Sequence, residues 1–352
     1  MLRDMGNIAF SGNIAISAVI RELSRRIPPG WSVERTPAED SRVRLKLIAA
    51  DGRSALVELS VRATLEPRSV PGLAGAQERR RGQPTQLVVV PFLSRGTRTR
   101  LREVGANYLD LTGNASIAIE RPGLFIETSG ADEDPNRTPR AARSLRGAKA
   151  GRVVRLLVDL QESPGVRELA ALAGLDAGYV SRILALLDGE GLIQRGKRGK
   201  IESVDWPRLL RTWADESPID ARGVRHTYLD PRGIEATLRR LAQLDTEYLV
   251  TCEAAARAYA PTTSPPLLTI WTADAERLAE VLALRPAKAG MNVILVEPRD
   301  ERVLAEFQLR DGVRFAPPSQ VAADLLSSPG RGPNEADSLL SWMEAHPGDW
   351  RR

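Results

Sequence analysis

The chain has 352 residues, of which 42% are hydrophobic and 27% charged, and its formal net charge is +5. At roughly 150 residues per domain this length predicts two or three domains, and the apolar content excludes wholesale disorder. A single cysteine, Cys252, and two histidines, His226 and His346, exclude a disulfide framework, a zinc finger and a histidine-rich metal centre. We therefore predict neither a bound metal nor a cofactor.

The positive charge is concentrated at the start of the chain. Residues 1–150 contain 24 basic and 16 acidic side chains, whereas residues 226–352 contain 14 basic and 18 acidic ones. This asymmetry predicts that the first two thirds of the chain contacts a polyanion. The apolar segment 5–20 is too short and too polar to span a bilayer and lacks the features of a signal peptide. We expect a cytoplasmic, nucleoid-associated protein with no membrane partner.

Residues 1–130 are expected to form an α/β sandwich. Apolar residues at helical spacing occupy 16–27, and Asp51-Gly52 indicates a hairpin between two strands. The run QLVVVPF at 86–92 is continuously apolar, which is typical of a strand buried on both faces. The complete prediction is helices at 16–27 and 96–104 and strands at 31–35, 43–49, 55–61, 86–92, 108–111, 116–120 and 124–128.

One enzymatic pattern lies in this first domain. Metal-dependent nucleases of the restriction-endonuclease type place an Asp and then a Glu-x-Lys on neighbouring strands, so that two carboxylates hold Mg²⁺ and the Lys orients the attacking water. Asp51 and Glu58 match the carboxylates, but Ser60 stands where the Lys is needed, and Arg62 follows two residues later. We predict a nuclease-like domain without catalytic residues, and therefore not an enzyme; a Mg²⁺-dependent nuclease is the alternative.

Residues 131–150 are predicted to be an arginine-rich linker. Basic residues recur at every third position from Arg137 to Arg155. In an extended chain with three residues per turn, this period places the charges on one side. The segment is either a solvated tether or an arm that contacts phosphates. The candidate arm residues are Arg140, Arg143, Arg146, Lys149 and Arg152.

Residues 151–221 are predicted to be a winged helix-turn-helix. Helices at 153–160, 166–173 and 177–187 are separated by the turns Ser163-Pro164-Gly165 and Gly174-Leu175, and Asp176 can cap the third helix. Strands at 192–195 and 201–204 then flank a basic, glycine-containing turn. In such a fold the third helix enters the major groove and the wing contacts phosphates. A winged helix used for protein contacts is the alternative.

The predicted DNA-reading side chains follow from this arrangement. Helix 177–187 would present its first turns to base edges, with Arg182 able to reach guanine. The wing 195–200 would neutralise phosphates. The candidate residues are Ala177, Gly178, Tyr179, Ser181 and Arg182 on the helix, and Arg195, Lys197, Arg198 and Lys200 on the wing.

Residues 222–352 are predicted to form a C-terminal mixed α/β domain. Two buried strands at 267–271 and 292–296 flank a helix at 273–284, and further helices are expected at 232–244, 253–260, 321–326 and 334–345. The chain is thus expected to be an α+β multidomain protein. Because the last domain has a net negative charge, it is a poor surface for nucleic acid, and we assign it to packing or partner contacts, including a homodimer.

Several segments together resemble the longer AbiEi-type antitoxins of type IV toxin-antitoxin systems, which are linked to abortive infection. They are GANYLDLTG at 105–113 with Asn114-Ala115, GLFI at 123–126, the predicted winged helix, and the stretch 312–332 with Ser319-Gln320 and Pro329-Gly330-Arg331-Gly332. The resemblance implies a transcriptional autoregulator that binds operator DNA. It also implies a nucleotidyltransferase-like toxin as genetic partner. The nuclease-like N-terminal domain is absent from the shortest members of that family.

The sequence therefore predicts a sequence-specific regulator that binds double-stranded DNA. No GxxxxGK[ST] phosphate loop and no GxGxxG motif is present, and no His lies in a recognisable arrangement with a nucleophile and an acid. The alternatives are the nuclease, which would need Asp51 and Glu58, and a protein-interaction scaffold that binds no DNA.

Overall fold

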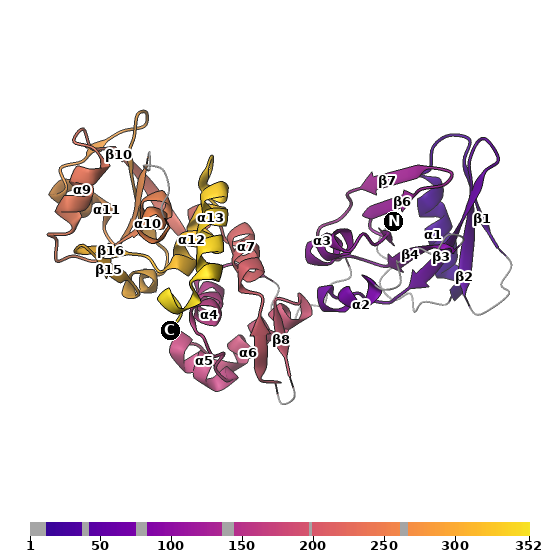
Figure 1. The fold of residues 1–352 in the computed structure, drawn as a ribbon, viewed down its shortest axis with the longest axis horizontal. Helices are drawn as coiled ribbons and strands as arrows, with labels where there is room; N and C mark the ends of the chain where they lie inside the picture. The colour runs from indigo at the N-terminus through magenta and orange to yellow at the C-terminus, as the bar shows by residue number, and fades with distance from the viewer. Residues whose placement is uncertain (1–11, 37–41, 75–82, 136–143, 197–198, 261–266) are drawn as a thin grey trace. The chain divides into compact units, whose positions relative to one another are not determined.

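A computed structural model describes residues 12–36, 42–74, 83–135, 144–196, 199–260 and 267–352. The chain is a mixed α/β protein with two seven-stranded sheets and one two-stranded sheet among these residues. It divides into two compact units, Met1–Ala141 with Gly189–Gly191, and Ala142–Asp188 with Leu192–Arg352 (Figure 1). The boundary predicted at residue 222 falls inside the second unit, so the division into three domains stays a prediction.

The first unit is built on a sheet whose strands follow chain order from β1 to β7. Strands β3, β4 and β5 are parallel, and the remaining neighbours are antiparallel. The hairpin predicted at Asp51-Gly52 joins β2 to β3, with Leu45 opposite Val57. The strands are β1 Ser32–Arg35, β2 Val43–Ile48, β3 Ser54–Val61, β4 Thr85–Val90, β5 Tyr108–Asp110, β6 Ala115–Ile119 and β7 Leu124–Thr128.

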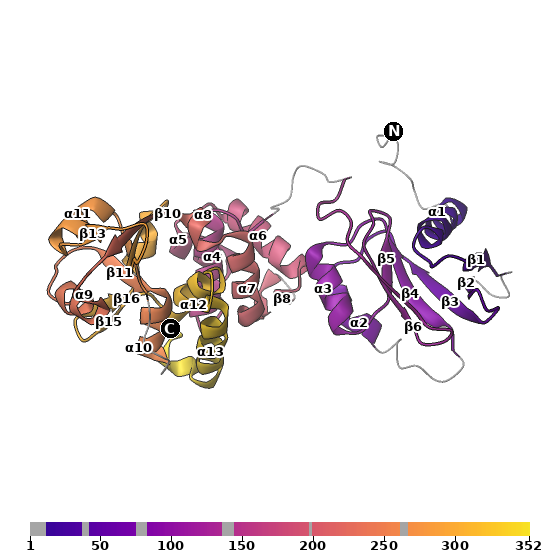
Figure 2. The same cartoon turned by 90° about the horizontal axis from the view of Figure 1, so that it is seen from above.

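Helices cover both faces of this sheet (Figure 2). The helix α1 (Gly12–Ser24) packs on one face together with Leu87 and Val89 of β4, whereas α3 (Arg95–Glu103) packs on the other face with Val88 and Val90. This alternation confirms a strand buried on both faces for the apolar run predicted at 86–92, but the strand ends at Val90, two residues before the predicted end. The short elements η1 (Pro67–Ser69) and α2 (Pro71–Ala74) lie beside α3 and complete the unit.

The second unit begins with three helices and a hairpin. They are α4 Ala148–Asp159, α5 Val166–Ala173, α6 Ala177–Gly189, β8 Ile193–Arg195 and β9 Ile201–Val204, followed by α7 Trp206–Glu216 and α8 Ile219–Arg222. The predicted elements 166–173 and 201–204 have the bounds seen in the structure. The helix expected at 153–160 begins five residues earlier. The prediction of an extended arm is therefore wrong from residue 148 onward, because Lys149, Arg152 and Arg155 lie on α4.

The rest of the second unit surrounds a curled mixed sheet with strand order β13-β10-β14-β12-β11-β16-β15. The predicted strand-helix-strand unit is present as β12, α11 and β14, with β12 and β14 parallel. Strands β10 and β11 were not predicted. The strands are β10 Gly223–Leu229, β11 Tyr248–Thr251, β12 Leu268–Thr272, β13 Arg285–Pro286, β14 Val293–Pro298, β15 Gln308–Arg310 and β16 Val313–Phe315. The helices are α9 Ile234–Leu241, α10 Cys252–Tyr259, α11 Ala275–Val281, α12 Pro318–Leu326 and α13 Gly332–Ala345, with 3-10 turns η4 Glu301–Ala305 and η5 Pro347–Asp349.

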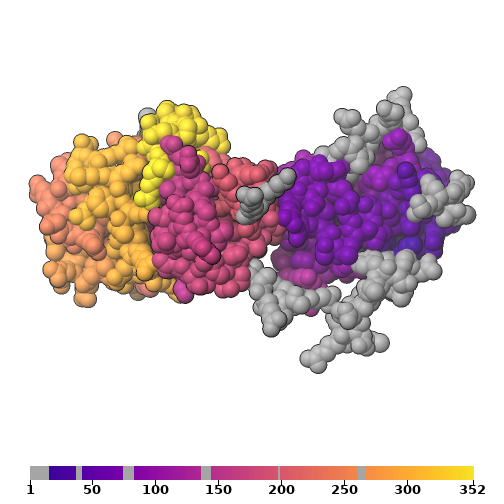
Figure 3. Space-filling view, turned by 90° about the horizontal axis from the view of Figure 1, so that it is seen from below, coloured from indigo at the N-terminus to yellow at the C-terminus, as the bar shows by residue number. Residues whose placement is uncertain are grey.

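One hydrophobic core joins the three helices to this sheet. Helix α12 packs against both α4 and α7, and buried residues from Val153 to Met343 form a single cluster. The end of the chain returns to the end of α4, where Arg352 N donates to Asp159 O (2.9 Å) and Gln161 N donates to Arg352 O (2.8 Å). Figure 3 shows the C-terminal residues in yellow beside the magenta surface of the α4–α6 region. The C-terminal residue is thus hydrogen-bonded to the end of α4 within the second unit.

No single helix in the described ranges is long and apolar enough to cross a membrane. Helices α5 and α6 satisfy the length and composition only when taken together, and they are bent by 113° at the turn between them.

Candidate nucleic-acid interface

The turn between α5 and α6 is fixed by local hydrogen bonds. Gly174 ends α5 in the left-handed conformation (φ 60°), which glycine adopts without the steric cost of a side chain. Leu175 N then donates to Ala170 O at 2.9 Å. The carboxylate of Asp176 accepts from Tyr179 N at 3.1 Å and so caps the start of α6, as the sequence predicts. These contacts hold the first turn of α6 at a defined angle to α5.

Helix α6 has one buried face and one exposed face. The buried face is the predicted one, formed by Val180, Ile183, Leu184 and Leu187, each at most 1% exposed. They pack with residues of α4 and α5 in the hydrophobic core. Of the predicted reading residues, Gly178, Ser181 and Arg182 are exposed, and Ala177 and Tyr179 are half-buried. The exposed face therefore carries two polar side chains and small neighbours within about one turn of the helix.

Tyr179 and Arg182 form a pair on this surface. The guanidinium carbon of Arg182 lies 6.0 Å from the centroid of the Tyr179 ring, at the outer limit of a cation–π contact. Partial burial raises the pKa of the Tyr179 hydroxyl, although Arg152 and Arg182 oppose this shift, so the side chain is a neutral hydrogen-bond donor at neutral pH. The pair thus combines a fixed positive charge with a neutral donor.

Backbone hydrogen bonds join the residues on either side of the connection between β8 and β9. Gly196 N donates to Lys200 O (2.9 Å) and Gly199 N donates to Gly196 O (3.1 Å), while Gly199 has a φ of 77°. Arg195 Nε donates to Gly199 O at 3.5 Å, so this guanidinium lies along the turn. Lys200 is exposed. Lys197 and Arg198 lie outside the described residues.

The predicted arm residues have different surroundings. Arg146 and Lys149 are exposed, and Arg140 and Arg143 lie outside the part of the chain that the structure describes. Arg152 has protein partners, because it donates to Ala173 O at 2.8 Å and its Nε lies 3.4 Å from Asp300 Oδ2. It is therefore less available to a phosphate than the sequence analysis assumed.

An exposed arginine near α6 was missed by sequence reasoning. Arg167 lies in the first turn of α5, where the helix N-terminus also favours anions. Its signal in the sequence was its place two residues after Gly165, the last residue of the predicted turn Ser163-Pro164-Gly165.

The two carboxylates of the nuclease alternative have arginine partners in the first unit. Asp51 lies in the β2–β3 turn and binds Arg53 (2.7 Å), which lowers the pKa of this carboxyl through a hydrogen bond from Arg53. Glu58 on β3 lies 3.2 Å from Arg44 Nε and accepts from Gln86 at 3.1 Å; burial raises the pKa of Glu58, but these hydrogen bonds outweigh it and the net shift is downward. The described residues contain no group of three or more His, Cys, Asp or Glu side chains that could hold a metal ion.

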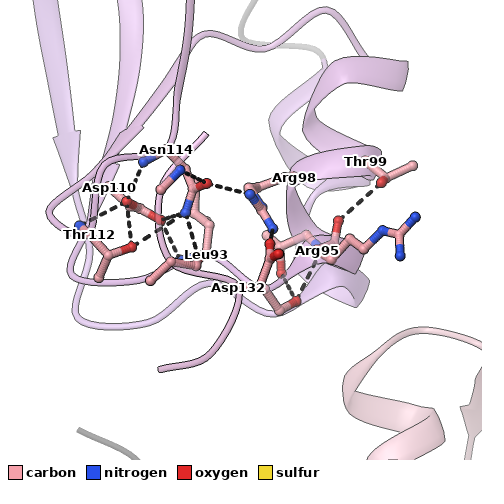
Figure 4. Close-up of polar contacts among 12 residues, drawn as sticks. Leu93, Arg95, Arg98, Thr99, Asp110, Thr112, Asn114 and Asp132 are labelled. Atoms are coloured by element: carbon pink, nitrogen blue, oxygen red, sulfur yellow. Dashed lines mark hydrogen bonds and ion pairs between the residues drawn. The ribbon is translucent and has the colours of Figure 1, made fainter. Parts of the chain in front are cut away.

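A buried polar cluster lies at the ends of β4 and β5 and was not predicted (Figure 4). Asp110, fully buried, accepts from Leu93 N, Thr112 N and Oγ1, and Asn114 N and Nδ2, at 2.8–3.0 Å. Asn114 in turn accepts from Arg98, which also binds Asp132. The carboxylate is surrounded by donors, so the cluster ties the loops at this edge of the sheet together. The motif LDLTGN at 109–114 was the signal in the sequence.

Comparisons with known proteins identify no family for the chain. No family model matches it, and no curated protein matches it. Among solved structures, the apo form of EndoMS is similar at 22% identity, over 27% of this chain and less than half (44%) of that chain, with a TM-score of 0.18. A TM-score of this size carries no argument about fold or function.

Proposed function

We propose that the chain is a transcriptional regulator that binds double-stranded DNA in a sequence-specific manner. In this proposal α4, α5, α6 and the hairpin β8–β9 form a winged helix-turn-helix, and α6 reads the major groove. The observation that carries the proposal is the exposed face of α6, where Ser181 and Arg182 stand among small residues while the opposite face is buried. Gly178 and Ala185 on the same face allow the helix to approach a base edge closely.

The surrounding charges support phosphate contacts. Lys200 on the hairpin, Arg167 at the start of α5, and Arg146 and Lys149 near the start of α4 are exposed cations in the same unit. Contacts of this kind fix a protein on the duplex and carry no sequence information, whereas Arg182 would supply base readout. The first unit would act as a nuclease-like domain without cleavage, and the C-terminal sheet as a surface for self-association.

The antitoxin-like role is a further part of this proposal. An autorepressor of that type would bind its own operator and would have a nucleotidyltransferase-like toxin as genetic partner. The neighbouring gene tests this part: an adjacent toxin gene agrees with it, and its absence leaves a regulator without a toxin.

The experiment that tests DNA binding is selection of bound fragments from a genomic library by the purified full-length chain. Recovery of fragments that share a sequence is the expected result. Enrichment of no sequence, together with equal retention of random duplexes, would contradict sequence-specific recognition. Absence of an electrophoretic mobility shift with any DNA at low salt would favour a protein-interaction scaffold.

A further inference from the structure

A cavity of about 570 Å³ lies within the second unit. Its wall is formed by residues of α4 and α7, by the segment after α7, and by β14 and α12. Small-molecule sites typically have volumes of about 300–1,000 Å³. The cavity is therefore large enough for an organic ligand, and it is separate from the exposed face of α6.

The lining of this cavity is rich in arginine. Five arginines and three acidic residues contribute to it, beside apolar groups that include Trp213, Trp271 and Val303. The arginines are Arg146, Arg152, Arg155, Arg222 and Arg299, and the acidic residues are Asp215, Glu216 and Asp300. Arginine presents a planar array of donors that matches carboxylate and phosphate oxygens. The lining thus combines an apolar wall with donors suited to an anion, of which Arg152 already pairs with Asp300.

Two of these arginines are held rigidly by neighbours. Arg222 lies 2.6 Å from the buried carboxylate of Asp324, and its guanidinium carbon is 4.7 Å from the centroid of the Trp213 ring. Arg155 lies 2.6 Å from Glu306 and is only 8% exposed. Because these contacts already fix the guanidinium groups, the protein would lose little side-chain entropy when a ligand binds.

Buried donors around the cavity lack acceptors. Trp213 is 3% exposed and its indole Nε1 has no hydrogen-bond partner; the Nε atoms of Arg155 and Arg222 also have none. A buried donor without a partner costs about 1–3 kcal/mol. These three atoms belong to residues of α4, α7 and α8 that line the cavity, but the atoms themselves are closed to solvent.

We propose that this cavity binds a small organic anion that carries a carboxylate or phosphate group on an aromatic body. The anionic group would accept hydrogen bonds from lining arginines, and the aromatic body would lie against the apolar wall. The cavity is separate from the reading face of α6, because none of the exposed residues of α6 lines it; it shares Arg146 with the proposed phosphate contacts.

The test uses the purified full-length chain and isothermal titration calorimetry at low ionic strength. The probes are 1-naphthoate, 1-naphthyl phosphate and the neutral 1-naphthalenemethanol, which share the same aromatic body. We expect saturable binding of about one anion per chain and at least tenfold weaker binding of the neutral alcohol, because a charge-assisted hydrogen bond contributes about 1.5–3 kcal/mol. The stronger of the two anions identifies the acceptor group, and tight binding of either supports the site.

Three variants locate the binding. Ala221 is exposed and lines the cavity, so Ala221→Trp should block it and abolish binding without disturbing the core. Arg299→Gln removes an exposed lining charge and should weaken anion binding about tenfold. Arg239→Gln removes an exposed arginine of α9 outside the cavity and should change nothing.

Three results would overturn the inference. They are absence of saturable heat with both naphthyl anions, equal affinity for anions and alcohol, or unchanged anion binding by Ala221→Trp that retains the native unfolding temperature. In each case water alone fills the cavity or the site lies elsewhere. Electrophoretic mobility shifts with DNA, measured on the same preparations, test the proposed function. Failure of ligand binding can therefore be distinguished from failure of DNA binding.

Discussion

Replacing Arg182 with alanine tests the proposed reading surface at an exposed charged side chain. Arg182 is exposed on α6, and the contact that the structure gives it is the 6.0 Å approach to the Tyr179 ring. Loss of this contact should change the free energy of unfolding by less than about 0.5 kcal/mol, the usual range for surface substitutions. A bidentate contact to a guanine contributes about 1–3 kcal/mol of discrimination, so the affinity for the selected site should fall roughly fivefold to 150-fold.

The assay is fluorescence anisotropy with the selected duplex and with a scrambled duplex of the same length, at one fixed salt concentration. Arg182→Ala should weaken binding to the selected duplex and should change binding to the scrambled duplex far less. Arg239→Ala, an exposed arginine on α9 of the same unit, is the matched control and should behave as the native chain. Equal losses of affinity for both duplexes would refute base reading by Arg182. Such a result would indicate that Arg182 contacts only phosphates.

Three further predictions address the hairpin, a buried carboxyl group and the cluster at the edge of the first sheet. Lys200→Ala should weaken binding to all duplexes alike and reduce the magnitude of the salt slope by about 0.9, measured as log K against log salt; an unchanged slope would remove Lys200 from the interface. Burial raises the pKa of Asp159 to about 6, partly opposed by Arg155, so the folded state binds a proton that the unfolded state releases near pH 4. Ionisation of Asp159 should therefore remove up to about 3 kcal/mol of stability between pH 4 and pH 7, measured in denaturant titrations as the difference between the pH profiles of the native chain and Asp159→Asn; identical pH profiles would contradict the shift. Asp110→Ala leaves buried donors without an acceptor and should lower the stability of the first unit by at least about 1–3 kcal/mol in urea unfolding, whereas a loss below about 1 kcal/mol would show that the cluster relaxes.

Local patterns in the sequence predicted the helices and strands that bury a regular apolar face. Helix α6 and strand β4 are examples, because their burial follows directly from the spacing or continuity of their apolar residues. Strand β10 was missed because its side chains are mostly half-buried and include Arg225 and His226, which hide the alternation of a strand. Strand β11 has four residues, too few for a pattern.

Contacts between distant parts of the chain were beyond prediction from local patterns. The three-residue period of basic side chains suggested an extended arm, but α4 forms there because Val153, Val154 and Leu157 bury a helical face. Arg155 then pairs with Glu306, which lies 151 residues further along the chain. The arginine-lined cavity has the same origin, since its wall combines α4 with β14 and α12.

The most direct test of the proposed regulator is the affinity of the purified full-length chain for duplex DNA, measured across a series of salt concentrations on fragments selected from a genomic library and on random duplexes. We predict that the selected fragments bind at least about 10³-fold more tightly than random ones, which is the lower end of the range for specific recognition, and that both affinities fall steeply with salt. Equal affinities for selected and random duplexes, or no binding at low salt, would contradict it.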